Sequence, residues 1–202
     1  MRYVEPIRDP EKVHEIEEIL EARKDTVKGW RMYMLFELGI YTGLRISDIV
    51  RLKVRDLKVR DPKGGDLKVR AHLSTKEKKT GKETILPLGK KIRKVIRQEL
   101  ADMDDDAYIF SSTHKSKTTG KEKHIDRKTA YNYMAAIKRE AGLPYSVGCH
   151  TLRKTFGYHF YKKTKRIGLI TIWFNHSAES ITKRYLGIDL DELTREAEGF
   201  EI

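Results

Sequence analysis

The sequence predicts a mainly α-helical protein with a small antiparallel β-sheet, the α+β class. Apolar residues recur at helical spacing in the first 52 residues and again after residue 90. Between these regions, residues 54–88 show the period-two alternation of strands, interrupted by turns that contain glycine and proline. A length of 202 residues suits one domain, and no clear linker divides the chain.

The first part of the chain is expected to hold three helices. Asp9 can cap the first of them, with Pro10 at the first helical position. Residues 30–41 predict a second, more apolar helix, which Gly43 can end in the left-handed conformation. A short helix over residues 49–52 follows.

The central segment predicts the sheet. The tetrapeptide Leu-Lys-Val-Arg occurs at 52–55, 57–60 and 67–70, and its alternation favours strands. Turn sequences lie at 61–65 and 79–82. We therefore expect about three antiparallel strands.

Helices return in the second half. An acidic triplet, Asp104 to Asp106, invites a metal interpretation, but a solvated turn is the favoured one. A polar, lysine-rich loop occupies residues 111–124, and an acidic tail covers residues 189–202. The expected helices span residues 90–103, 126–141, 150–164, 167–174 and 179–185.

Composition indicates a polyanionic partner. The chain has 42 Lys and Arg against 30 Asp and Glu, a net charge of +12, so nucleic acid is favoured over basicity for solubility alone. A single cysteine, Cys149, excludes an internal disulfide and a thiolate metal cluster. The sequence shows no apolar run typical of a signal peptide or a membrane span. We expect a soluble, intracellular protein.

Two arginines, two histidines and a tyrosine point to phosphodiester chemistry. They are Arg45, His150, Arg153, His176 and Tyr185. A tyrosine hydroxyl has a pKa of about 10 and is a weak nucleophile. It becomes effective on a phosphate only where fixed cations stabilise the charge of the transition state.

Each of these residues, taken singly, has a plain structural explanation. Arg45 can pair with Asp48 at the surface, and His176 can cap a helix. Tyr185 is one of ten tyrosines, most of which serve packing. The prediction therefore depends on the order and spacing of the whole set.

That order resembles the tyrosine recombinases, the integrase family of phages and mobile elements. The resemblance runs from about Val4 to Ile188, and it implies a mainly helical catalytic domain with a β-hairpin insertion. The matching segments are Thr42-Gly43-Leu44-Arg45-Ile46-Ser47-Asp48, Lys79-Thr80-Gly81-Lys82 with Pro87-Leu88, His150-Thr151-Leu152-Arg153-Lys154-Thr155-Phe156, Asn175-His176-Ser177 and Tyr185.

The resemblance implies a role for each residue of the set. Arg45 and Arg153 would hold the non-bridging oxygens of the scissile phosphate, for which a planar, always-charged guanidinium is suited. His150 would assist proton transfer to or from Tyr185, and His176 would donate a hydrogen bond to the phosphate. Tyr185 would attack phosphorus and form a 3′-phosphotyrosyl link. Neither ATP nor a metal or other cofactor is implied.

A hairpin lysine is expected to protonate the leaving 5′-oxygen. The family places it at the turn, eight residues before the proline of the next strand, which selects Lys79. Its neighbours Lys76, Lys78 and Lys82, together with Lys154, are expected to bind DNA. Alternatively, the whole hairpin cluster contacts only backbone phosphate.

The chain departs from the family pattern in two places. The family usually has Leu-Gly before the second histidine, where this chain has Phe174-Asn175. About 40 residues precede the first motif, and they resemble the first helices of the catalytic domain. We expect residues 1–188 to be that domain without an N-terminal core-binding domain, either as half of a longer protein or as a short member.

The resemblance also implies partners and a location. We expect double-stranded DNA as substrate, a homo-tetramer on two DNA sites, and action on nucleoid DNA in a bacterial cytoplasm. The acidic tail would pack on a neighbouring protomer or fold on its own core. Rival interpretations are a type IB topoisomerase, a non-catalytic regulator derived from an integrase, and a metal-dependent nuclease using the aspartate triplet.

Overall fold

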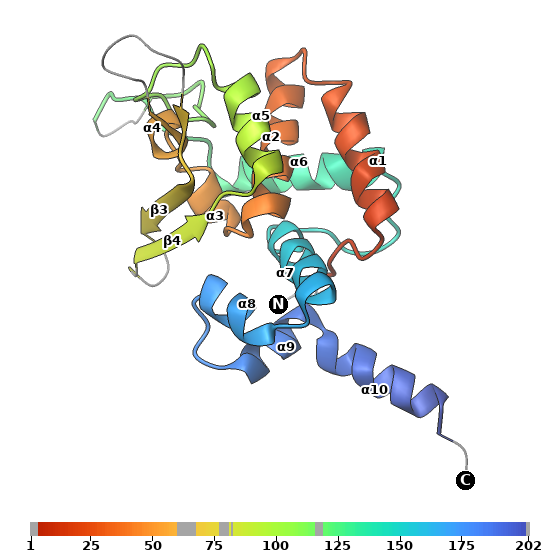
Figure 1. Cartoon of the computed structure of the whole chain (residues 1–202). Helices are drawn as coiled ribbons and strands as arrows, with labels where there is room; N and C mark the ends of the chain where they lie inside the picture. The colour runs from red at the N-terminus through yellow and green to blue at the C-terminus, as the bar shows by residue number, and fades with distance from the viewer. Residues whose placement is uncertain (1–3, 60–67, 77–80, 82, 116–118, 201–202) are drawn as a thin grey trace.

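The computed structural model describes residues 4–59, 68–76, 81, 83–115 and 119–200 (Figure 1). Its helices are α1 Pro10–Glu21, α2 Val27–Thr42, α3 Ile46–Ile49, α4 Val54–Leu57, α5 Lys90–Glu99, α6 Arg127–Glu140, α7 Thr151–Thr164, α8 Ile167–Trp173, α9 Glu179–Leu186 and α10 Ile188–Glu198. Its strands are β1 Lys58–Val59, β2 Lys68–Val69, β3 His72–Lys76 and β4 Glu83–Pro87. The predicted class, mainly helical with a little antiparallel sheet, is confirmed.

Side-chain caps set the starts of the principal helices. The Asp9 carboxylate accepts a hydrogen bond from the backbone N–H of Glu11 at 2.9 Å, and Pro10 opens α1 as predicted. The Thr26 hydroxyl caps α2, and Asp126 caps α6. Each cap satisfies a backbone donor that the first helical turn leaves without a partner.

The strands form two separate antiparallel pairs, where a single sheet of about three strands was expected. β1 pairs with β2, and β3 pairs with β4 over five residues, from His72 opposite Pro87 to Lys76 opposite Glu83. Residues 54–57, expected as strand, form helix α4. The Asp56 carboxylate accepts from the backbone N–H of Lys53, and α4 buries Val54 and Leu57 one turn apart.

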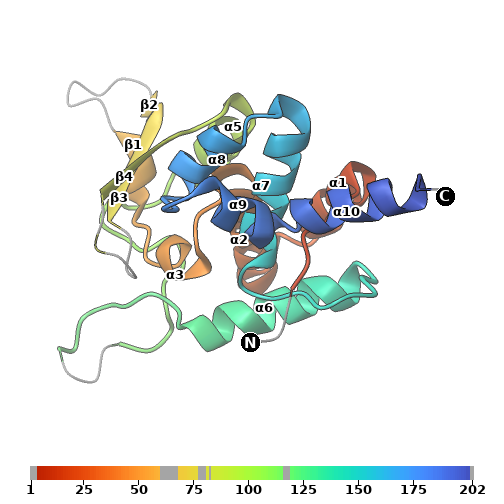
Figure 2. The same ribbon diagram turned by 90° about the horizontal axis from the view of Figure 1, so that it is seen from below.

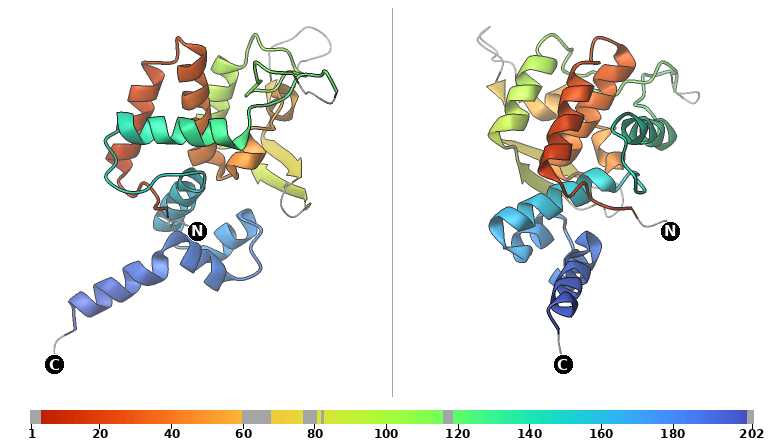
Figure 3. Two further views of the ribbon diagram at one scale, coloured as in Figure 1. Left: turned by 180° about the vertical axis from the view of Figure 1, so that it is seen from behind. Right: turned by 90° about the vertical axis from the view of Figure 1, so that its right-hand side faces the viewer.

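Two hydrophobic clusters organise the molecule. The larger one surrounds α2, which packs against α1, α5, α6 and α7. The smaller one, formed by Ile170, Phe174, Leu186 and Ile188, lies among α7, α8 and α9. Figure 1 shows these last helices below the main body, and Figure 3 shows α6 crossing α1 and α2 from behind. α7 belongs to both clusters and therefore joins them.

The acidic tail is a helix that points away from the body. α10 extends on the side opposite the two strand pairs (Figure 2). Its apolar residues Leu190 and Leu193 are 63% and 67% exposed, while Asp191 pairs with Arg8 near the N-terminus. Within the described residues, no helix combines the length and apolarity needed to cross a bilayer.

A buried lysine closes the end of α5. The Lys58 side chain has no exposed surface, and its ammonium donates to the backbone carbonyl oxygens of Leu100 at 2.6 Å, Met103 at 2.8 Å and Ala101 at 3.2 Å. The carboxylate of Asp105 lies 3.6 Å away. The cation therefore satisfies the carbonyls at a helix C-terminus, where positive charge is favoured.

Replacing Lys58 with methionine is expected to lower the free energy of unfolding by about 2–4 kcal/mol, because one buried and two partly buried carbonyls lose their donor. Urea denaturation followed by circular dichroism measures the change. Lys94→Met, at an exposed position on α5, is the matched control. Equal stabilities for the two variants would contradict this assignment.

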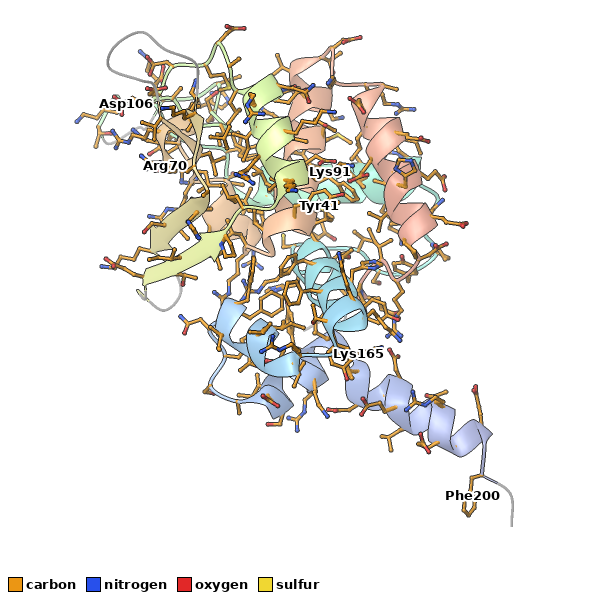
Figure 4. All side chains as sticks on the ribbon, viewed as in Figure 1. Tyr41, Arg70, Lys91, Asp106, Lys165 and Phe200 are labelled. Carbon is orange, nitrogen blue, oxygen red and sulfur yellow. The ribbon has the colours of Figure 1, made fainter. Side chains whose placement is uncertain are left out.

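A buried glutamate couples stability to pH. Glu37 on α2 is 1% exposed, and burial raises its pKa to about 8, with the nearby Glu17 carboxylate adding to the effect. Glu17 itself accepts from the Tyr41 hydroxyl at 2.7 Å and from the Lys91 ammonium at 3.0 Å. Tyr41 and Lys91 lie together between α2 and α5 (Figure 4).

The folded protein therefore holds a proton on Glu37 that the unfolded chain loses above pH 4.5. Stability is expected to fall as pH rises from about 4.5 to 8, and Glu37→Gln, which cannot ionise, should flatten this decline. Urea midpoints at pH 5, 6.5 and 8, with the exposed Glu15→Gln as control, measure the difference. A decline that persists unchanged in Glu37→Gln would rule out Glu37 as its source.

Candidate active site

The five residues of the predicted set lie on four segments that meet beside α7. Arg45 immediately precedes α3, His150 and Arg153 stand at the start of α7, His176 lies between α8 and α9, and Tyr185 is on α9. The helices α7, α8 and α9 pack on one another, and α7 packs on α2. The fold thus brings together residues that are up to 140 positions apart.

The turn at Gly43, which ends α2, positions Arg45 beside the other site residues. α2 ends at Gly43, which has the left-handed φ of 63° that was predicted. A Cβ atom here would lie 2.5 Å from a ring carbon of Phe156, so no other residue fits without movement. The backbone then turns so that the carbonyl of Arg45 starts α3 by accepting from Asp48 at 2.8 Å.

Arg153 joins two of the site's loops. It is 3% exposed, and its guanidinium donates to the carbonyl oxygen of Gly43 at 2.8 Å and to that of Phe174 at 2.9 Å. The same guanidinium lies 4.0 Å from the ring centre of Phe174. The planar, rigid fork of a guanidinium, with its several donors, suits binding to both carbonyls at once.

The departure at Phe174-Asn175 preserves the turn before His176. Asn175 has a φ of 53°, the left-handed conformation that asparagine tolerates better than other non-glycine residues. Its backbone N–H donates to Ile172, and that of His176 donates to Thr171, both at 3.0 Å. Phe174 is fully buried and supplies the aromatic surface on which Arg153 lies.

Tyr185 is half-buried among the other site residues. Its hydroxyl lies 3.2 Å from Nδ1 of His150. Its ring meets the rings of His176 and Phe174 edge to face, at centroid distances of 5.5 and 5.9 Å. Burial raises the pKa of Tyr185 to about 12, although the positive charge of Arg153 acts in the opposite direction. The phenol is therefore protonated near neutral pH and needs a base.

His150 is in a suitable state to be that base. Burial lowers its pKa, and the positive charges of Arg153, Arg127 and Arg45 lower it further. The imidazole is thus neutral at pH 7, and its Nδ1 can accept a proton from the adjacent phenol. The site thus places a neutral proton acceptor, His150, beside a protonated nucleophile, Tyr185, among fixed positive charges. This arrangement suits attack by the tyrosine on an anionic group.

The hairpin lysines lie mostly outside the described residues. This holds for Lys79, the expected general acid, and for Lys78 and Lys82. Lys76 is described, exposed at the end of β3, and lines a polar cavity of about 230 Å³ together with Asp48 of α3. The hairpin therefore adjoins the helix that follows Arg45.

Lys154, which was expected to bind DNA, lies beside the ring of Tyr185. It is 5% exposed, and its ammonium lies 5.2 Å from the ring centre of Tyr185. Burial lowers its pKa. We therefore assign Lys154 to the surroundings of the tyrosine.

The aspartate triplet is built into a turn. Asp106 pairs with Arg55, and Asp104 accepts from the backbone N–H of Asp106 at 2.8 Å. Asp105 lies 3.6 Å from the ammonium of Lys58. Among the residues that the structure describes, no group of three His, Cys, Asp or Glu side chains is placed to hold a metal ion.

Sequence reasoning missed three contributors to this site. The charge of Arg127, at the start of α6, acts on His150. Thr182 is fully buried and bonds to His176. Phe174 was noted only as a departure from the family pattern. The spacing of Thr182, one helical turn before Tyr185, was the one available signal.

This fold and this group of residues define a tyrosine recombinase catalytic domain. The chain belongs to the phage integrase family, whose sequence model matches residues 12–191. It is 38% identical over 191 residues to the probable integrase/recombinase YoeC of Bacillus subtilis, covering 95% of this chain and 93% of that protein. It is 26% identical to the tyrosine recombinase XerA of Pyrococcus furiosus, covering 91% of this chain but 59% of that protein.

Solved structures show the same fold. The crystal structure of XerA recombinase matches 98% of this chain and 66% of its own, with a TM-score of 0.67 and 19% identity. XerH recombinase bound to its difH substrate matches 96% of this chain and 53% of its own, with a TM-score of 0.66 and 18% identity. The chain thus spans between half and two thirds of these longer recombinases, but nearly all of YoeC.

Proposed function

We propose that this chain is the catalytic part of a site-specific DNA recombinase that cuts and rejoins double-stranded DNA through Tyr185. One observation carries the proposal above all. The hydroxyl of Tyr185 lies 3.2 Å from a neutral histidine, His150, in the field of Arg45 and Arg153. The family supports it, and so does the likeness to XerH, whose structure holds its difH substrate.

The proposed cleavage step is a transesterification. The oxygen of Tyr185 bonds to phosphorus while its proton passes to Nδ1 of His150, and the bond from phosphorus to the 5′-oxygen breaks. The products are a 3′-phosphotyrosyl link and a 5′-hydroxyl. One phosphoester replaces another, so the reverse attack by a 5′-hydroxyl rejoins DNA without ATP.

Positive charge makes the step possible. The non-bridging oxygens gain negative charge as phosphorus becomes five-coordinate, and Arg45 and Arg153 are proposed to bind them. His176 is proposed to donate a further hydrogen bond. Donors that are fixed before the substrate arrives stabilise such a transition state most effectively. The binding of Arg153 to two backbone carbonyls fits this requirement, since its position is set by the fold.

The remaining assignments follow from the same proposal. Lys79 is proposed to protonate the 5′-oxygen, and Lys76, Lys78 and Lys82 to bind backbone phosphates near the cut. The net charge of +12 favours contact with DNA on a wider surface. We further propose assembly as a tetramer on two DNA sites, in which the exposed apolar side chains of α10, Leu190 and Leu193, pack on a neighbouring protomer.

Covalent capture on DNA tests this function. The protein is incubated with nicked fragments of chromosomal DNA from its source organism, in EDTA, and adducts are precipitated with detergent and potassium. Sequencing of the bound DNA identifies the site, and peptide mapping identifies the attached residue, expected to be Tyr185. Strand exchange between two recovered duplexes then separates a recombinase from a topoisomerase. Cleavage that needs a metal, or an adduct on another residue, would refute the proposal.

A further inference from the structure

A buried threonine holds the second histidine. Thr182 lies on α9, one turn before Tyr185, and has no exposed surface. Its hydroxyl oxygen lies 2.9 Å from Nδ1 of His176 and 2.9 Å from the hydroxyl oxygen of Thr171 on α8. One side chain thus connects the loop that carries His176 to both neighbouring helices.

The direction of these hydrogen bonds determines where His176 carries its proton. The Thr171 hydroxyl has two acceptors within reach, the Thr182 hydroxyl oxygen at 2.9 Å and the Ile167 carbonyl at 3.0 Å, and the tautomer follows from the arrangement in which it donates to Thr182. A hydroxyl has a single proton, which Thr182 can then donate to Nδ1 of His176. Nδ1 becomes an acceptor, and the neutral ring carries its proton on Nε2, on the other side of the imidazole.

That tautomer suits an anionic substrate. A phosphodiester oxygen only accepts hydrogen bonds, so a neutral histidine can bind it only through an N–H. If Nδ1 carried the proton, Nε2 would present a lone pair to the phosphate, which is repulsive. His176 can therefore donate to the phosphate through Nε2 in one neutral tautomer and cannot do so in the other.

The surroundings of the ring limit its other movements. His176 lies edge to face with Phe174 and Tyr185, each at a centroid distance of 5.5 Å. Its backbone N–H donates to the carbonyl of Thr171 at 3.0 Å. Packing and backbone thus set the place of the ring, while the Thr182 hydroxyl bonds to one of its two nitrogens.

We propose that Thr182 is a positioning residue that keeps the proton of His176 on Nε2 for the phosphate. The role in cleavage rests on the proposed function, whereas the tautomer is a property of the protein alone. Two experiments therefore test the two parts separately.

The first experiment observes the tautomer directly. Long-range ¹H–¹⁵N spectra of protein with ¹⁵N-labelled histidine distinguish Nε2–H from Nδ1–H, and His176→Asn assigns the signal. The wild type is expected to show Nε2–H at His176, and Thr182→Val a loss of this preference. An Nδ1–H form in the wild type, or an unchanged signal in Thr182→Val, would overturn the proposal whether or not the protein cuts DNA.

Thr182→Val is a fair test because it nearly keeps the side-chain volume and leaves few groups unsatisfied. Thr171 retains the carbonyl of Ile167, 3.0 Å from its hydroxyl oxygen, as an acceptor. Thr194→Val on α10 is the matched control, since the exposed Thr194 hydroxyl donates to the carbonyl of Leu190 four residues earlier, as the Thr182 hydroxyl can to that of Ala178 at 3.5 Å. Melting temperatures of both variants report any general loss of stability.

The second experiment measures the rate of adduct formation on the duplex recovered by covalent capture. Thr182→Val is expected to slow adduct formation about tenfold or more, which is the usual effect of removing a hydrogen bond that orients a functional histidine. Thr182→Ser is expected to restore the rate. In a His176→Ala background, Thr182→Val should add no further loss. Full activity of Thr182→Val, or an equal loss with and without His176, would overturn the role in cleavage.

Should the wild type form no adduct at all, the proposed function fails while the spectra still decide the assignment of Thr182. A serine variant as slow as the valine variant would likewise count against the proposal, because serine keeps the hydroxyl.

Discussion

Phenylalanine at position 185 is expected to abolish covalent attachment to DNA while leaving DNA binding intact. The substitution removes only the hydroxyl, which lies 3.2 Å from His150, and retains the ring that packs on Phe174 and His176. The other hydroxyl assigned to the site, that of Thr182, is fully buried. Gel-shift titration and adduct formation on a nicked duplex, measured in parallel, show the two effects.

Tyr131→Phe is the matched control, because Tyr131 is 52% exposed on α6 and takes no part in the site. It is expected to form adducts at the wild-type rate. An adduct that survives in Tyr185→Phe would show that another residue attacks phosphorus, and the whole assignment of the site would fall with it.

Substitution of Arg153 is expected to have the next largest effect. Arg153→Ala should slow adduct formation by about 10²-fold or more, as loss of a fixed charge donor does in other enzymes. It should also lower the free energy of unfolding by about 2–4 kcal/mol, since the buried carbonyls of Gly43 and Phe174 lose their donors. Single-turnover rates and urea denaturation measure the two consequences.

Arg153→Lys separates charge from geometry. A lysine keeps the positive charge but lacks the rigid fork that reaches both carbonyls, so most of the activity should still be lost. Arg195→Ala, at an exposed position on α10, removes a charge without affecting either measurement. Near-normal rates in Arg153→Lys would mean that charge alone matters at this position.

The elements that the sequence predicted well are those with a local chemical signal. Asp9 and Asp126 cap helices through hydrogen bonds to the next few residues. Gly43 ends α2 in the left-handed conformation, with a φ of 63°, which depends on the residue type and not on contacts with other elements. The alternation around residue 54 was misleading, because Val54 and Leu57 are also one helical turn apart and Asp56 favours a helix start. Period-two and period-3.6 patterns overlap in segments this short.

The site residues were predicted from their order along the chain, and the charges inside the protein were not. Three charged residues, Lys58, Lys154 and Glu37, are buried, and in a sequence with 36% charged residues nothing marked them as such. Their partners lie on other elements, such as the carbonyls at the end of α5 for Lys58. Only the folded chain brings such partners together. For the same reason, the bond between Thr182 and His176 had no counterpart in the motif.

The two hydrogen bonds of Arg153 also make the active site depend on the folding of the rest of the molecule. One of its bonds reaches the end of the central helix α2, and the other reaches Phe174 in the second cluster. Release of the guanidinium would therefore loosen the contacts of both clusters. On heating, we expect activity and fold to disappear at the same temperature.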